Sequence, residues 1–73
     1  MKRYANRSGE SGVVAYDDRP GTIVVQFQGG ETYEYTAGSA GASVVADMQR
    51  LARSGRGLST YIAKHRPAFA RRL

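Results

Sequence analysis

The sequence predicts an α+β domain in which a three-stranded antiparallel meander is followed by two helices packed on one face of the sheet, in the order β-β-β-α-α. Three observations support this fold. Residues 13–36 contain three short apolar stretches of strand type, and tight-turn residues separate these stretches. Residues 44–66 instead carry apolar side chains at helical spacing. A run of strands followed by a run of helices is typical of a sheet with its helices on one side.

The three strands are expected at "VVAYD", "TIVVQFQ" and "ETYEYT". Gly29 and Gly30 give a two-residue hairpin signal between the second strand and the third. The segment "DDRPG", between the first strand and the second, is rich in residues that form turns. We therefore interpret Asp17 and Asp18 as turn residues rather than as acid–base groups or metal ligands.

Tyr33 and Tyr35 lie two residues apart in the third predicted strand, so their side chains share one face of the sheet. Two interpretations follow, because paired aromatic rings serve either as a platform on which bases stack or as part of a small core. Thr32, Glu34 and Thr36 occupy the opposite face, which suits contact with water. We therefore expect both tyrosines to pack beneath the helices as a structural motif.

The first helix is expected over residues 44–54, after a connection of small residues, "AGSAGAS", at 37–43. Ser43 is the predicted N-cap, and Gly55 is the predicted C-terminal stop. The apolar stripe of this helix contains Val44, Val45, Met48, Leu51 and Ala52. This stripe is the face that we expect to cover the sheet.

The second helix is expected over residues 56–66 and ends before Pro67, which disfavours a helical conformation at the residue before it. His65 falls on or near the apolar face of this helix, so we interpret it as a partly buried residue. Phe69 follows the helix and is expected to dock back on the core.

Seventy-three residues are enough for one domain, which we place at residues 13–73. Residues 1–12 are polar, and they are predicted to form a flexible basic arm. The chain has no cysteine and a single histidine, so neither a disulfide nor a metal site is expected, and no cofactor is implied. Small domains often need stabilisation beyond their core, and without disulfides or a metal a homodimer is the remaining way to supply it.

The sequence also lacks an apolar run long enough to cross a membrane, and no apolar segment follows its basic start. A cytoplasmic protein is therefore expected. Catalysis is not expected, because a cysteine nucleophile is absent and His65 has no serine and acid at a recognised spacing. No phosphate-binding loop motif is present either.

Positive charge is concentrated in the last third of the chain, which contains seven basic residues and no acidic one. Such asymmetry indicates a polyanionic partner, and we expect a nucleic acid. The alternative is a solvated basic face without a partner. The candidate binding residues are Arg50, Arg53, Arg56, Lys64, Arg66, Arg71 and Arg72, with Lys2, Arg3 and Arg7 of the arm as helpers.

The segment "SGRGLST" at residues 54–60 has two interpretations. Glycines on both sides of Arg56, just before a helix, would leave backbone amides free to hold an anion. An ordinary turn between two helices uses glycine in the same way. We favour the ordinary turn, because the pattern is short and such turns are common.

The combination "AYD…GTIVVQFQGGETYEYT", a helix and "SGRGLSTYIAKHRP" resembles the KTSC domain, a small module found alone and at the C-terminus of some lysyl-tRNA synthetases. The resemblance spans residues 16–69. Its central feature is the Tyr33-Glu34-Tyr35 triplet after the strand at 21–27, and Ser54, Gly57 and Ile62 match a later "S-x-G" and isoleucine. It implies an α+β domain that binds RNA.

Two function hypotheses follow from the residues and from this resemblance. The first is a non-catalytic module that binds RNA through a basic C-terminal helical surface. The alternative is a protein–protein adaptor or inhibitor, such as a phage-encoded anti-CRISPR protein, since tyrosine and arginine are favoured anchors of protein interfaces.

Overall fold

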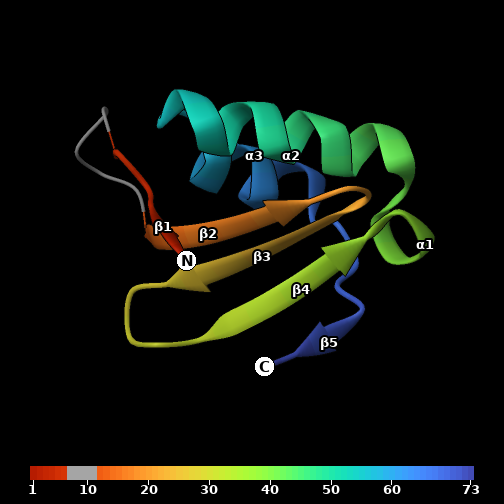
Figure 1. The fold of residues 1–73 in the computed structure, drawn as a ribbon, viewed down its shortest axis with the longest axis horizontal. Coiled ribbons are helices and arrows are strands. Elements are labelled where there is room, and N and C mark those ends of the chain that lie inside the picture. The colour runs from red at the N-terminus through yellow and green to blue at the C-terminus, as the bar shows by residue number, and fades with distance from the viewer. Residues whose placement is uncertain (7–11) are drawn as a thin grey trace.

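A computed structural model describes residues 1–6 and 12–73, and its sheet has five antiparallel strands. Their order in the sheet is the order in the sequence, β1-β2-β3-β4-β5 (Figure 1). The strands are β1 (Lys2–Arg3), β2 (Val13–Arg19), β3 (Thr22–Phe27), β4 (Thr32–Thr36) and β5 (Arg71–Arg72). The predicted meander corresponds to β2, β3 and β4, and a two-residue strand extends each edge of it.

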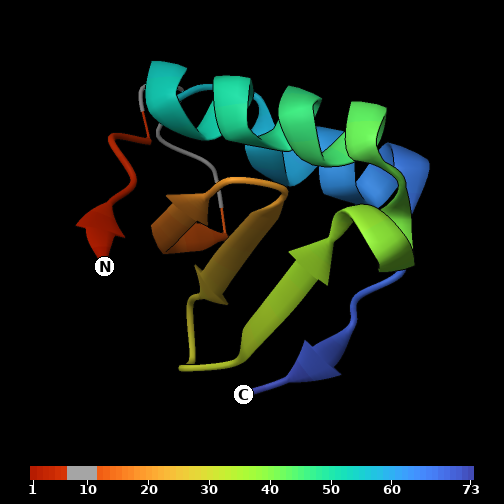
Figure 2. The same ribbon diagram turned by 45° about the vertical axis from the view of Figure 1, so that its right-hand side comes forward.

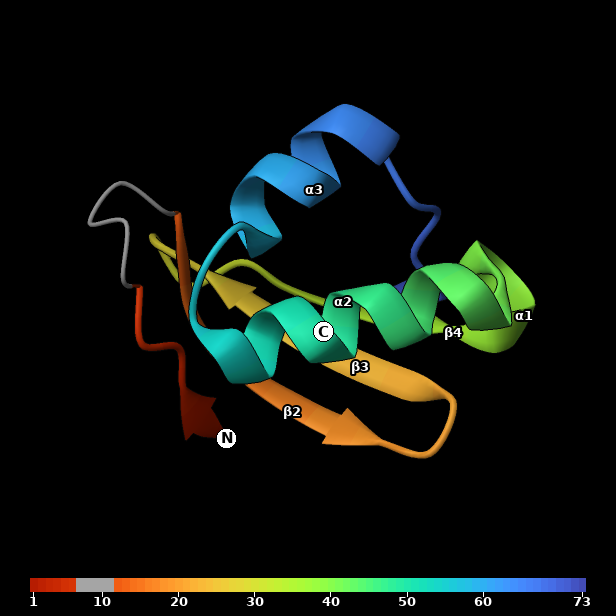
Figure 3. The same cartoon turned by 90° about the horizontal axis from the view of Figure 1, so that it is seen from above.

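Three helices connect β4 to β5: α1 (Ala37–Ala40), α2 (Ala42–Ser54) and α3 (Leu58–His65). The two longer helices lie side by side on one face of the sheet, as Figures 1 and 3 show. Among residues 1–6 and 12–73, no helix covers the other face of the sheet (Figures 1 and 3). The predicted α+β architecture, with strands followed by helices on one face, is confirmed.

Sequence alternation decides which strand residues face the helices. Tyr16 pairs with Val25 and Val25 with Tyr33, while Ile23 pairs with Tyr35, so these side chains share the covered face. Val13 joins them because a β-bulge between Val13 and Ala15 shifts the alternation by one residue. The bulge therefore keeps an apolar residue in the core at the start of β2.

The core lies between this sheet face and the helices. Helix α2 contributes Val45, Met48 and Ala52, which recur at the spacing of one helical face, and α3 contributes Leu58. Val44 and Leu51, predicted in the same stripe, are partly buried at its margins. The predicted apolar face of the first helix is thus confirmed, with its centre at Met48.

The turn between β2 and β3 is shorter than predicted. Only Pro20 and Gly21 form it, whereas Asp17 and Asp18 lie inside β2 and pair with Val24 and Ile23. The interpretation of these aspartates as turn residues was wrong. Gly21 adopts a φ of 69°, which a glycine adopts without strain, so this one residue suffices to reverse the chain after proline.

The connection after β4 also differs from the expectation. Thr36 and Ser39 form a capping box that starts the single-turn helix α1, with reciprocal bonds of 3.1 and 3.0 Å between side chain and backbone. Helix α2 then begins at Ala42 after Gly41, so Ser43 is not its N-cap. The chain can turn from α1 into α2 at this point because Gly41 takes a φ of 98°, which a glycine adopts without strain.

Residues 1–6 contribute to the fold, although a flexible arm was predicted over residues 1–12. Strand β1 pairs with β2, and the Tyr4 amide donates to the Val14 carbonyl at 3.0 Å. Tyr4 is a core residue with 3 % of its surface exposed, and its hydroxyl accepts a bond from the Leu58 amide at 3.2 Å. Residues 7–11, which include Arg7 of the predicted arm, lie outside the described residues.

The C-terminal segment returns to the sheet at the edge opposite β1, as Figure 2 shows. The Ala70 amide donates to the Glu34 carbonyl at 2.7 Å, and the Leu73 amide donates to the Thr32 carbonyl at 2.8 Å. Phe69 was expected to dock on the core, but 51 % of its surface is exposed. It contacts the margin of the core through Tyr33 alone among the ring contacts of the described residues.

Candidate nucleic-acid interface

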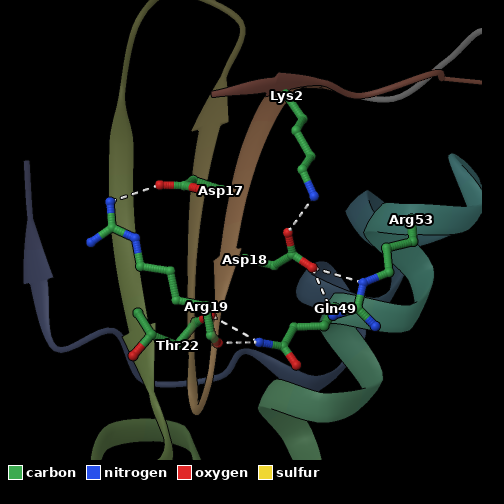
Figure 4. A network of polar contacts seen from close by, with 7 residues as sticks. All are labelled: Lys2, Asp17, Asp18, Arg19, Thr22, Gln49 and Arg53. Carbon is green, nitrogen blue, oxygen red and sulfur yellow. Dashed lines mark hydrogen bonds and ion pairs between the residues drawn. The ribbon is translucent and has the colours of Figure 1, made fainter.

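Asp18 organises the charged groups near the β1 edge of the sheet. Its Oδ1 accepts a hydrogen bond from Lys2 Nζ at 3.1 Å, and its Oδ2 accepts one from Arg53 Nε at 2.7 Å (Figure 4). The Asp18 side chain is only 5 % exposed, whereas those of Lys2 and Arg53 are 63 % and 60 % exposed. One carboxylate therefore ties β1 and α2 to β2.

The two cations lower the pKa of Asp18, the hydrogen bond from Lys2 most strongly, while burial acts in the opposite direction. Gln49 adds a second link between α2 and the same hairpin. Its amide donates to the backbone carbonyls of Arg19 and Thr22, at 2.7 and 2.9 Å (Figure 4). The C-terminal half of α2 is thus attached to the β2–β3 hairpin through the side chains of Gln49 and Arg53.

Two more of the predicted binding arginines also have acidic partners. Arg50 pairs with Asp47 one turn earlier on α2, at 3.3 Å, and Arg71 pairs with Glu34 across β4 and β5, at 2.8 Å. Such exposed pairs add little stability, but a phosphate would have to compete with the carboxylate in each of them. Together with Arg53, three of the seven predicted residues therefore have part of their charge compensated within the fold.

The remaining four predicted residues have no ion pair with an acid among residues 1–6 and 12–73. They are Arg56 between α2 and α3, Lys64 and Arg66 at the end of α3, and Arg72 in β5. Arg56 precedes α3, whose eight residues span about 12 Å, whereas the other three lie in the last turn of α3 or beyond it. The seven residues do not form one helical surface, since Arg53 lies toward the β1 edge and Arg71 and Arg72 lie in β5.

Lys64, Arg66, Phe69 and Arg72 lie within nine residues of one another, and we call this group the C-terminal basic surface. Arg66 and Arg72 are each three residues from Phe69, so each Cα lies within about 11 Å of the Phe69 Cα. Lys64 and Arg66 also suit the C-terminal end of α3, where the helix dipole favours positive charge. All four side chains are exposed.

An aromatic cluster supports this surface. The Tyr33 ring lies 4.8 Å from the Phe69 ring and 5.8 Å from the Phe27 ring, centre to centre. The Arg72 guanidinium lies over Tyr33, with its carbon 5.9 Å from the ring centre, a distance compatible with cation–π attraction. Phe69 and Arg72 are therefore both positioned by Tyr33.

Tyr33 and Tyr35 have different environments despite sharing a face. Tyr35 is buried in the core, and this burial raises the pKa of its hydroxyl. Tyr33 is only partly buried, and its hydroxyl donates to Glu31 at 2.9 Å, which is the main cause of its raised pKa. The core interpretation is confirmed for Tyr35, whereas Tyr33 joins the core to the C-terminal basic surface.

The turn at residues 54–60 shows the ordinary interhelical arrangement. Gly55 takes a left-handed conformation that ends α2, and its amide bonds to carbonyls of the preceding turn. The first amide of α3, at Leu58, is already bonded to the Tyr4 hydroxyl. An anion would have to replace this buried bond to use that amide.

His65 is exposed, so its predicted place near the buried face was wrong. Its ring stacks on Tyr61, with the centres 4.1 Å apart, and the Tyr61 hydroxyl donates to Asp47 at 3.3 Å. Burial and the Asp47 carboxylate raise the pKa of Tyr61. In the part of the chain that the structure describes, no three histidine, cysteine, aspartate or glutamate side chains are grouped to hold a metal ion.

Within residues 1–6 and 12–73, every helix is too short or too polar to cross a membrane. Comparisons of the chain with protein-family models, with curated proteins and with solved structures gave no match. The arrangement of the side chains is therefore the basis for assigning a function. It offers cations and an exposed ring, which suit binding of an anionic aromatic partner.

Phe69 is the residue of this surface that sequence analysis assigned elsewhere. Its neighbours gave a signal, because Phe69 lies between Arg66 and the Arg71–Arg72 pair with no other large apolar residue beside it. A single aromatic residue among cations is compatible with docking on the core and with stacking on bases. The exposure of half of the Phe69 surface favours stacking over docking on the core.

Proposed function

We propose that this protein is a non-catalytic, cytoplasmic RNA-binding module that contacts phosphates through the C-terminal basic surface. The observation that carries the proposal is the set of cations at Lys64, Arg66 and Arg72, which have no acidic partner among the described residues. Their charge is available to phosphates, whose neutralisation releases counterions. Arg56 offers one further contact beyond the other end of α3.

The preference for RNA over DNA comes from the resemblance to the KTSC domain, and it remains part of the proposal. The relevant residues are Tyr33, Tyr35 and the strand before them, and of these Tyr33 contacts both Phe69 and Arg72. Tyr33, part of the tyrosine pair on which the resemblance rests, therefore lies beside the surface that we propose binds RNA.

A salt titration with matched variants tests the proposal. Single-stranded RNA is titrated with the wild-type protein, with the site variant Arg66→Gln/Arg72→Gln, and with the control variant Arg19→Gln/Arg50→Gln. Both variants remove two positive charges, but the control residues already pair with Asp17 and Asp47. We expect the site variant to lose affinity and to lower the log–log salt slope by about 1.4, as two lost phosphate contacts would.

The control variant should bind RNA nearly as the wild type does. Equal losses in both variants would show that the total charge attracts RNA without a defined surface. Absence of RNA binding by the wild-type protein at low salt would overturn the proposed function.

A protein–protein adaptor or inhibitor, for example one directed against a CRISPR system, is the second candidate. The exposed Phe69 beside Arg72 favours it, because aromatic and arginine side chains are enriched at interface centres. A pull-down that recovers one stoichiometric protein partner, with the same yield after nuclease treatment, would support this function over RNA binding.

A further inference from the structure

Phe69 combines exposure with a fixed position. About half of its surface is open to solvent, and Phe69 is the only aromatic residue among the exposed large apolar side chains of the described residues. Its contact with Tyr33 holds one part of the ring against the sheet. A well-positioned aromatic surface is thus left open at the end of α3.

The backbone on both sides of Phe69 limits how far this ring can move. Ala70 is bonded through its amide to the Glu34 carbonyl, and β5 follows directly. On the other side, Pro67 fixes one backbone angle soon after the end of α3. Stacking on a ring that is already positioned costs little conformational entropy.

The cations around the ring suit a nucleic acid chain. Arg72 lies over Tyr33, the same ring that contacts Phe69, and Arg66 lies three residues before Phe69. A base stacked on Phe69 would therefore have guanidinium groups within reach of the phosphates beside it. Proteins that bind single strands use this combination of a basic path and aromatic stacking.

We propose that Phe69 stacks on an unpaired base and that the protein consequently prefers single-stranded RNA to duplex RNA. The inference rests on the proposed RNA-binding function and adds the form of RNA that this surface accepts. In a duplex the bases are already stacked on one another, so the ring would have no free base face to contact. Phosphate contacts alone do not make this distinction.

The test compares oligouridine with the duplex of oligouridine and oligoadenine of the same length, at one salt concentration. Fluorescence anisotropy is measured for the wild-type protein and for Phe69→Ala, Phe69→Leu and Phe69→Tyr. Val14→Ala is the matched control, since Val14 is another exposed apolar residue and lies in β2. Circular dichroism establishes that each variant is folded.

We expect the wild-type protein to bind the single strand more tightly than the duplex. Phe69→Ala should weaken single-strand binding by roughly ten-fold, within the range found for loss of one base–aromatic stack, and should leave duplex binding and the salt slope unchanged. Phe69→Leu keeps an apolar contact to Tyr33 but should lose the preference as well. Phe69→Tyr and Val14→Ala should behave as the wild type.

The outcomes separate this inference from the function on which it rests. If the wild-type protein binds both RNA forms equally, or if Phe69→Ala and Phe69→Leu bind the single strand as the wild type does, stacking is overturned while RNA binding stands. If the wild-type protein binds neither RNA form at low salt, the proposed function is overturned, and the stacking inference with it.

Discussion

The two edges of the sheet carry similar residues that have different roles. At the β1 edge, Lys2 and Arg53 converge on Asp18, and Tyr4 is buried in the core. At the β5 edge, Arg72 has no acidic partner among the described residues and Phe69 is half exposed. Each edge thus has a cation and an aromatic ring beside a two-residue strand, but only the β5 edge combines an exposed ring with a cation, Arg72, that has no acidic partner among the described residues.

The difference arises from one nearly buried carboxylate. Asp18 on the helix side of β2 gives Lys2 and Arg53 a common partner. At the other edge, Glu34 pairs with Arg71 and Glu31 bonds to the Tyr33 hydroxyl, so neither printed contact compensates Arg72. A basic residue therefore cannot be assigned to binding from its charge alone. The presence of an acid across the fold decides whether its charge is compensated.

The largest expected effect is on stability, and it contrasts Tyr4 with Phe69. Tyr4→Ala should lower the free energy of unfolding by about 3–5 kcal/mol, because it opens a cavity in the core and leaves the Leu58 amide without its partner. Phe69→Ala should lower it by about 1 kcal/mol, since half of the ring is already exposed. Urea unfolding followed by circular dichroism measures both values.

A small domain has little stability to lose, so Tyr4→Ala is expected to be largely unfolded. Tyr4→Phe is the milder variant, which removes only the hydroxyl and should lower the free energy of unfolding by about 1–2 kcal/mol. Similar losses for Tyr4→Ala and Phe69→Ala would mean that the two edges contribute equally and that this contrast is wrong.

The second effect concerns the charges at the β1 edge. Asp18→Asn should lower the free energy of unfolding by about 1–2 kcal/mol at neutral pH, a modest value because Lys2 and Arg53 are mostly exposed. RNA affinity of the folded variant should not fall, because the variant frees two cations without removing any from the C-terminal basic surface. Equilibrium unfolding and RNA titration of the same sample test both statements.

The contribution of Asp18 should depend on pH in one direction. Its pKa is lowered in the folded state, so ionised Asp18 stabilises the fold fully above its ordinary value of about 3.9. This stabilisation is lost as the pH falls through the lower folded pKa. The difference in stability between the wild type and Asp18→Asn should be constant from about pH 7 to pH 5 and shrink below about pH 4. A difference that persists in acid would contradict the role of the ion pairs.

The meander and the main helices were predictable because their signals are local and periodic. Alternation in β3 and the glycine pair after it specify a hairpin, and Met48 lies at the centre of an apolar helical stripe. Strands β1 and β5 were not predictable in this way, since two residues are too few to show alternation. Their positions depend on Tyr4 and on backbone bonds to residues distant in the sequence.

The candidate site was predictable only in part, for a related reason. The basic composition of the C-terminal third predicted a basic surface there, and the predicted residues include Lys64, Arg66 and Arg72, which have no acidic partner among the described residues. Sequence could not show that Asp18, assigned to a turn, pairs with Arg53 from 35 residues away. Nor could it show that Tyr33 lies at the margin of the core and contacts Phe69 while Tyr35 is buried, because strand alternation places both side chains on the same face.

The smallest effect that we predict concerns Glu31, the acid that bonds to the aromatic cluster beneath the C-terminal basic surface. Glu31→Gln removes a negative charge bonded to Tyr33, the ring that supports Phe69 and Arg72. RNA affinity should rise about two-fold, because one less carboxylate repels the phosphates at this surface, and the rise should fade at high salt.

Asp17→Asn changes the net charge equally but lies in β2, so it is the matched control and should leave affinity unchanged. Equal gains in both variants would show that RNA responds to net charge, and the distinction between the two edges would then not extend to binding.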